Sequence, residues 1–179
     1  MMSTKFLHQD YVILLETILK NIKALHEVSG ILLRKYAKNK KGGFGHIVQF
    51  LLYSSAEECG KFLIVKDLYP RKLSERTLRA NGFNSHQKKW AKLLRYYAEQ
   101  TGDLKNFAFY RTTANDASDF IRSKVREASF YVNYKNGKVI RPSFQSGKSF
   151  EKLAKASVSF ARLCEWELKK FIKTPVFSG

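Results

Sequence analysis

The chain has 179 residues, of which 44% are hydrophobic and 14% aromatic, and this composition excludes general disorder and suits a single globular domain over residues 1–179. Its 33 lysine and arginine residues outnumber the 15 acidic residues, which gives a formal net charge of +18. A surplus of this size favours a polyanionic partner, with nucleic acid the first expectation and an anionic membrane surface the second.

The first half of the chain predicts two long helices. Over residues 7–37 apolar residues recur at steps of three and four, which is the period of an amphipathic helix. This helix ends in the basic, glycine-rich loop KNKKGGFG. A second helix is predicted over residues 45–69, and Pro70 ends it because proline lacks an amide hydrogen and cannot continue the helical hydrogen bonds.

The middle of the chain predicts two shorter helical segments. Residues 70–84 are expected to be irregular or briefly helical, with a break at Gly82. Ser85 is the predicted N-cap of a third helix, which ends near Gly102. After a loop, a fourth helix is predicted over residues 115–131.

The last third of the chain combines an extended segment with a helix. Residues 130–147 alternate like a short hairpin around the turn signal Asn136-Gly137, or form an irregular extended segment. A final helix is predicted over residues 149–171. The predicted fold class is therefore all-α, a bundle of about five helices with one short hairpin or irregular excursion.

The two cysteines and the N-terminal region restrict the cellular setting. Cys59 and Cys164 both lie in apolar helical patterns, so we expect small buried residues in a reducing compartment and no disulfide, metal or cofactor. Asp10 and Glu16 interrupt what would be the apolar region of a signal peptide. The sequence also lacks a run of about 18 uncharged apolar residues that could cross a membrane. We expect a cytoplasmic protein.

The stretch SSAEECGKFL, residues 54–63, places two adjacent carboxylates in the most apolar part of the chain. At about 100° per residue, Glu58 falls within the apolar stripe, whereas Glu57 lies in a polar band beside Lys61. A shielded carboxylate is costly unless it is paired, so we predict a Glu57–Lys61 pair and a partner for Glu58 on a neighbouring helix. The candidate partners of Glu58 are His86, Lys89 and Arg126.

Two interpretations of these charges follow from the pattern. The first is a structural network that only neutralises the shielded carboxylates. The second is a functional cluster in a cleft, where burial and neighbouring charge tune the affinity for protons.

Two further segments follow the carboxylates in a characteristic order. FNSHQKKW, residues 83–90, has a histidine before a lysine-rich turn, and REASFYVNYKNGKVIRPSF, residues 126–144, has a basic-acidic pair, an aromatic-Tyr-Val stretch, a turn and a proline. Together with Glu-Glu-x-Gly-Lys in residues 57–61, they resemble the AbiV family of bacterial abortive-infection proteins, in the HEPN superfamily of helical, often RNA-cleaving domains. The matching residues are Glu57, Glu58, Gly60, Lys61, His86, Lys89, Arg126, Glu127, Tyr131 and Pro142. Gly60 is expected to let another helix approach closely.

The chain departs from the superfamily at one point. Many HEPN nucleases carry an arginine a short distance before a histidine, usually with a polar residue directly after the arginine. Arg79 and His86 have such a spacing, but Ala80 stands in the polar position, and Gly82 predicts that this segment is not one continuous helix.

The resemblance implies an antiphage effector that engages RNA, as a metal-independent, toxin-like endoribonuclease. Such a site needs a base for the 2′-hydroxyl proton, an acid for the leaving oxygen and cations for the phosphate. The predicted catalytic residues are His86, Glu58, Glu57, Lys61 and Arg79. The predicted RNA-binding residues are Lys89, Lys88, Arg126 and Tyr131.

Alternatives to catalysis remain open. A non-catalytic interaction module would bind a phage protein, a host protein or an RNA, and its polar cluster would be structural. The resemblance also implies a homodimer, and an antitoxin is a further candidate partner. Binding of the basic helices to an anionic membrane is a third alternative, which we do not favour.

Overall fold

The computed structural model describes residues 4–38, 45–101, 133–135, 138–140 and 148–173. In these parts the chain forms five helices and two short antiparallel strands, with Asn133 opposite Ile140. The elements are α1 (Thr4–Lys38), α2 (Gly45–Leu68), α3 (Glu75–Ala80), α4 (His86–Thr101), β1 (Asn133–Lys135), β2 (Lys138–Ile140) and α7 (Lys148–Lys173).

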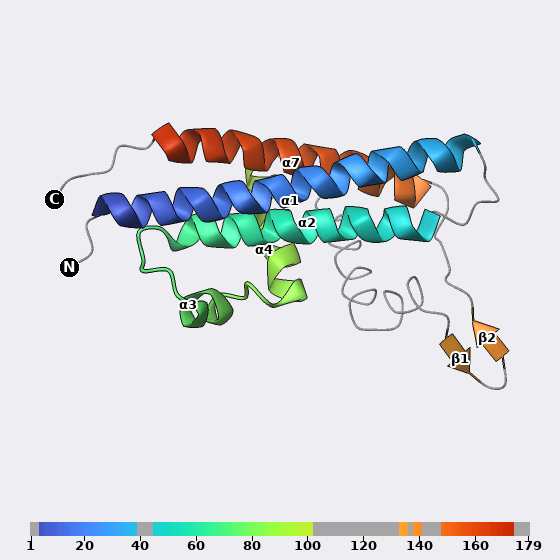
Figure 1. Ribbon diagram of the computed structural model, residues 1–179, viewed down its shortest axis with the longest axis horizontal. Coiled ribbons are helices and arrows are strands. Elements are labelled where there is room, and N and C mark those ends of the chain that lie inside the picture. Colours follow the sequence, from blue (N-terminus) through green and yellow to red (C-terminus); the bar gives the residue numbers. More distant parts are fainter. Residues whose placement is uncertain (1–3, 39–44, 102–132, 136–137, 141–147, 174–179) are drawn as a thin grey trace.

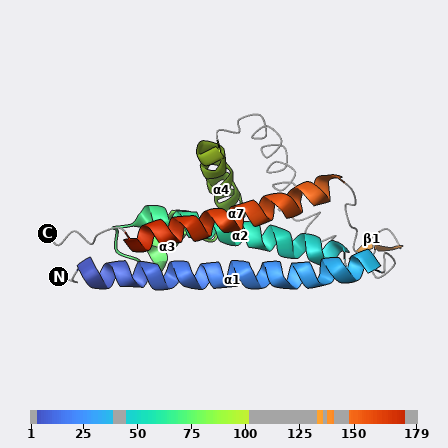
Figure 2. The same cartoon turned by 90° about the horizontal axis from the view of Figure 1, so that it is seen from above.

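The long helices α1, α2 and α7 lie side by side, and α1 runs in the direction opposite to the other two (Figure 1). Helix α4 lies outside this group and crosses α2 at a steep angle (Figure 2). The short helix α3 lies in the connection between α2 and α4. This arrangement leaves α2 in contact with three other helices.

Helix α2 is the centre of the hydrophobic core. It contributes apolar side chains on nearly every side, as expected for a helix that is apolar around most of its circumference. The fully buried members from α2 include Val48, Ala56, Cys59, Phe62, Leu63 and Val65. Their neighbours are Tyr11, Leu15 and Ile22 from α1, Leu93 from α4, and Phe160 and Cys164 from α7.

The all-α fold class is confirmed, and so are most of the predicted elements. The helices predicted over residues 7–37, 45–69 and 149–171 correspond to α1, α2 and α7, and the strands of the predicted hairpin are β1 and β2. Both cysteines are free and buried. The predicted helix over 115–131 and the turn residues 136–137 lie outside the described residues. Among the described helices, none is long and apolar enough to cross a membrane.

Tyr11 connects α1 to the segment that leads toward α3. Its hydroxyl donates a hydrogen bond of 2.8 Å to the backbone carbonyl of Arg71, and its ring packs edge-on against Tyr69. Burial raises the pKa of Tyr11 to about 12, so the phenol keeps the proton it donates. The contact holds the start of the α2–α3 connection against the bundle.

His26 joins α1 to α7 in the other half of the bundle. Its Nε2 lies 2.9 Å from the hydroxyl of Ser157, which is fully buried and lies 3.5 Å from the carbonyl oxygen of Leu52 in α2. Burial lowers the pKa of His26, because a charged imidazole is poorly solvated there.

This burial predicts a stability that falls in mild acid. As the pH falls below the ordinary histidine pKa of 6.5, His26 is protonated more readily in the unfolded chain than in the folded one, because its pKa is lower in the folded protein. Acid therefore favours unfolding. The variant His26→Gln can still hydrogen-bond Ser157 but does not titrate. Urea unfolding from pH 7 to pH 5 is expected to show a shallower loss of stability in His26→Gln, and equal slopes would contradict the assignment.

Candidate functional site

The connection between α2 and α4 is folded by short-range hydrogen bonds. Ser74 caps α3, and its Oγ accepts a hydrogen bond of 3.0 Å from the Thr77 amide. After α3 the chain turns at Gly82, whose φ of +91° lies in the left-handed region that glycine adopts without strain. The amide of Phe83 then donates to the carbonyl of Leu78 at 3.0 Å, which closes the turn.

Ser85 begins α4, as predicted. Its hydroxyl accepts a bond of 3.3 Å from the Lys88 amide, and its carbonyl accepts one of 3.0 Å from the Lys89 amide. His86 and Lys89 are three residues apart in the first turn of the helix, so they lie on the same face. That face meets α2.

Gly60 determines how closely α4 approaches. A Cβ at this position would lie 2.3 Å from the carbonyl oxygen of Lys89 and 2.7 Å from its carbonyl carbon. The backbone of α4 therefore rests directly on α2 at Gly60, which confirms the close helix approach predicted there. Glu57 lies three residues earlier on the same face of α2, opposite the first turn of α4.

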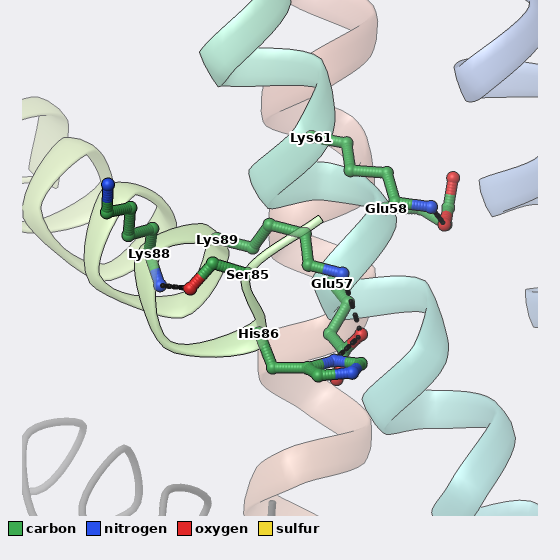
Figure 3. A network of polar contacts seen from close by, with 7 residues as sticks. All are labelled: Glu57, Glu58, Lys61, Ser85, His86, Lys88 and Lys89. Carbon is green, nitrogen blue, oxygen red and sulfur yellow. Dashed lines mark hydrogen bonds and ion pairs between the residues drawn. The ribbon is translucent and has the colours of Figure 1, made fainter. Parts of the chain in front are cut away.

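Glu57, His86 and Lys89 form one polar group, which we call the Glu57 cluster (Figure 3). Oε2 of Glu57 lies 2.6 Å from Nδ1 of His86 and 3.1 Å from Nζ of Lys89. The side chains of Lys89 and Glu57 are 4% and 14% exposed, whereas that of His86 is 35% exposed. His86 is thus the member that solvent or a ligand can reach, and the other two lie beneath it.

The predicted pairing of the two carboxylates is wrong in its details. Lys61 pairs with Glu58, three residues away, and Glu57 is the residue that contacts α4. The angular positions of Glu57 and Glu58 on the helix could not predict which of them contacts α4, because α2 is apolar on nearly every side. The position where α4 crosses α2, at Gly60, brings Glu57 against α4. Nζ of Lys61 also lies 5.4 Å from the centre of the Phe83 ring, a contact that the sequence pattern did not indicate.

The other predicted site residues lie apart from the cluster or outside the described residues. Arg79 forms an exposed ion pair with Glu75 within α3, and the break between α3 and α4 confirms that Arg79 and His86 do not share one helix. Lys88 is exposed and points away from Glu57 (Figure 3). The side chains of Arg126 and Tyr131 fall among the residues that the structure does not describe.

A second buried group, the Lys66 network, was missed by sequence reasoning. Nζ of Lys66 lies 2.7 Å from Oε2 of Glu167 and 3.2 Å from the hydroxyl of Tyr96, so the network joins α2, α7 and α4. Burial alone would raise the pKa of Glu167, but the hydrogen bonds from Lys66 and Tyr96 outweigh it and hold that pKa below its ordinary value. The available signal was the spacing of Glu167, seven residues after the buried Phe160 on the same helical face.

The Glu57 cluster has a defined proton arrangement. An ionised carboxylate only accepts hydrogen bonds, so the contact between an ionised Glu57 and His86 requires the imidazole proton on Nδ1, which then donates the hydrogen bond. The lone pair of a neutral His86 is then on Nε2, the atom through which this imidazole acts as a base. Within the described residues, no group of three or more His, Cys, Asp or Glu side chains is placed to hold a metal ion.

The close contact at Gly60 predicts a destabilised and displaced α4 when a side chain is added. Gly60→Ala is expected to lower the free energy of unfolding by about 1–3 kcal/mol, the usual cost of overpacking, because the added Cβ meets backbone atoms rather than a mobile side-chain end. Urea unfolding measures the loss. Gly30→Ala in α1 is the matched control, since its nearest heavy atom would be 3.7 Å away at the end of the Arg34 side chain. Equal stability losses would contradict the close approach.

Comparison with known protein families identifies a match over most of the chain. The family model described as AbiV, of the HEPN type, matches residues 11–164, and this span contains the Glu57 cluster. Neither the curated proteins nor the solved structures include a match to the chain.

Proposed function

Since the chain belongs to the AbiV family of HEPN proteins, we propose that it is an antiphage abortive-infection effector that binds RNA and cleaves it without a metal ion. The observation that carries this proposal is the contact of 2.6 Å between Glu57 and Nδ1 of His86. A shielded carboxylate that orients a reachable imidazole is the arrangement a general base requires.

The proposed reaction is an internal transfer at one phosphodiester. Nε2 of His86 accepts the proton of a 2′-hydroxyl, and that oxygen forms a bond to the adjacent phosphorus. The bond from phosphorus to the 5′ oxygen breaks, and the leaving oxygen takes a proton from water. The hydroxide that remains is neutralised by the proton on His86, which restores the neutral imidazole. The products are a 2′,3′-cyclic phosphate and a 5′-hydroxyl end. Glu57 stabilises the imidazolium that forms. Lys61, predicted from the sequence to be catalytic, pairs with Glu58 outside the Glu57 cluster and has no step in this reaction.

A second candidate function is a non-catalytic interaction module. It is favoured by the pairing of both carboxylates within the protein and by the position of Arg79, which is paired with Glu75 on a separate helix. In this case the Glu57 cluster would only neutralise charge where α4 crosses α2.

The two functions are distinguished by incubating the purified protein with total RNA in the presence of a chelator. We expect cleavage by the wild type, strong loss in His86→Ala, and no cleavage of an oligodeoxyribonucleotide, which lacks the 2′-hydroxyl. Cleavage that persists unchanged in His86→Ala would overturn the assignment of His86. If RNA stays intact under every condition, the interaction module is the better description.

The same preparation tests the proposed partners. A homodimer is proposed from the family membership, and light scattering coupled to gel filtration measures the mass directly. A phage or host protein, or an antitoxin, is the partner expected for the interaction module, and copurification from infected and uninfected cells would compare them.

A further inference from the structure

The surface around α3 and the start of α4 is almost purely basic. Between residues 69 and 98 the sequence has eight lysine and arginine residues and one acidic residue, Glu75. Lys89 and Lys92 are held by carboxylates of α2, Glu57 and Asp67, and Arg79 forms an exposed pair with Glu75 within α3. The exposed basic residues of this region are Arg71, Lys72, Arg76, Arg79, Lys88 and Arg95.

Three of these residues flank the turn between the two helices. Arg76 and Arg79 are three residues apart in α3 and so lie on neighbouring positions of one face. The alkyl chain of Lys88 packs over Gly82, where a Cβ would lie 2.3 Å from its Cδ, and the Gly82 amide donates to the Arg79 carbonyl at 3.0 Å. We call Arg76, Arg79 and Lys88 the α3–α4 basic face.

This face adjoins the Glu57 cluster across a single helical turn. Lys88 lies between His86 and Lys89 in the sequence, but its side chain leaves the first turn of α4 on the side away from Glu57 (Figure 3). The first turn contains no acidic residue, so the positive end of the helix dipole adds to the field of the basic side chains. A strand that reaches His86 can continue over this turn onto the basic face.

The described surfaces of α1 and α7 differ from this face in polarity, and α1 differs in charge as well, whereas α7 also carries exposed basic residues. Over residues 8–35 of α1, four basic residues are balanced by Asp10, Glu16 and Glu27. The exposed large hydrophobic residues also lie on α1 and α7 rather than on α3 or α4, and they are Ile13, Val28, Ile31, Val158, Trp166 and Ile172. A membrane-binding face combines basic and exposed apolar residues, whereas the α3–α4 basic face offers positive charge without them.

We propose that the α3–α4 basic face binds the phosphodiester backbone of a single-stranded RNA on one side of the Glu57 cluster. The inference rests on the proposed function for the identity of the nucleic acid. A single strand is favoured because the 2′-hydroxyl must swing into line with the bond that breaks, which a regular duplex restricts. Phosphate contacts carry no sequence information, so the face contributes affinity and position but no base specificity.

The test measures how binding depends on salt in proteins of equal charge. The first variant combines Arg76→Gln, Arg79→Gln and Lys88→Gln. The matched control combines Lys20→Gln, Lys35→Gln and Lys173→Gln, three exposed lysines on α1 and α7. Both variants lose three positive charges, and both carry His86→Ala so that the RNA stays intact. The probe is a fluorescein-labelled oligouridine, titrated by anisotropy from about 50 to 200 mM salt.

In the basic-face variant, the magnitude of the negative slope of log K against log salt concentration is expected to fall by about 2. Each lost phosphate contact on a single strand contributes about 0.7 to this magnitude. The control variant should have the same slope as the protein that carries His86→Ala alone. Equal slopes in the two variants would overturn the proposal, because binding would then follow net charge alone. Loss of binding to anionic vesicles with an unchanged RNA slope would overturn it in favour of a membrane.

The salt-dependence test of the basic face can fail or succeed independently of the cleavage test of the proposed function. If the wild type never cleaves RNA but the two charge variants show the expected slopes, the RNA-binding face is supported and the catalytic assignment is wrong. If the wild type cleaves RNA but the slopes of the two variants are equal, the catalytic assignment is supported and the RNA-binding face is wrong. Circular dichroism of each variant checks that the fold is intact.

Discussion

Glu57→Gln is expected to lower the rate of RNA cleavage by about 10²- to 10⁴-fold, the range for an impaired general base, whereas Glu58→Gln leaves it within a few-fold of the wild type. The two glutamates are adjacent in α2 and equally shielded, at 14% exposure each. They differ in their partners, because Glu57 accepts from His86 and Glu58 pairs with Lys61. Their comparison therefore separates the orientation of His86 from loss of a negative charge.

The physical reason is the protonation state of His86. With an amide in place of the carboxylate, nothing requires the proton to stay on Nδ1, and the imidazolium formed during proton transfer loses its counter-charge. The cleavage assay would report the rate, measured per folded molecule. Equal losses in the two variants would contradict a special role for Glu57.

The role of Glu57 can also be tested by a measurement that does not require the protein to cleave RNA. Nitrogen chemical shifts of the His86 ring identify its tautomer, and we expect the Nδ1-protonated form in the wild type and in Glu58→Gln. Glu57→Gln should show a mixture of tautomers. Lys89→Met serves as a further control, because it removes the buried ammonium group but leaves the Glu57–His86 contact available.

The helices and their ends could be predicted because their signals are local. Apolar periodicity gave α1, α2 and α7, Pro70 marked the end of α2, and the Ser85 cap marked the start of α4. Gly60 could also be predicted as a point of close approach, since the absence of a side chain is itself a local property. Each of these features depends on a few neighbouring residues.

The sequence could predict which residues belong to the site, but not which of them contact one another. The sequence placed Glu57, Glu58, Lys61, His86 and Lys89 in one site but paired the two carboxylates with the wrong bases. The correct pairing depends on the crossing point of α4 on α2, which is fixed by long-range packing. The same limit explains why Lys66 and Glu167, which are 101 residues apart, could not be paired from the sequence.

The Lys66 network predicts the largest effect on stability. Glu167→Gln is expected to lower the free energy of unfolding by about 3–5 kcal/mol, because it leaves Lys66 in a shielded position without its counter-charge. The matched control is Glu165→Gln, two residues away on α7, which breaks the exposed pair with Lys23 and should cost at most about 1 kcal/mol. Urea unfolding at pH 7 measures both.

The network also predicts how this difference changes with pH and with a second substitution. The pKa of Glu167 is lowered in the folded protein, so its stabilising contribution is complete above the ordinary glutamate value of 4.5 and is lost as the pH falls through the lower folded value. The wild type and Glu167→Gln should therefore converge in stability in acid. Combining Lys66→Met with Glu167→Leu removes both charges and should recover most of the loss, because a buried ion pair contributes little beyond an apolar pair of similar volume. A double variant as unstable as Glu167→Gln would show instead that the two charges themselves hold α2, α4 and α7 together.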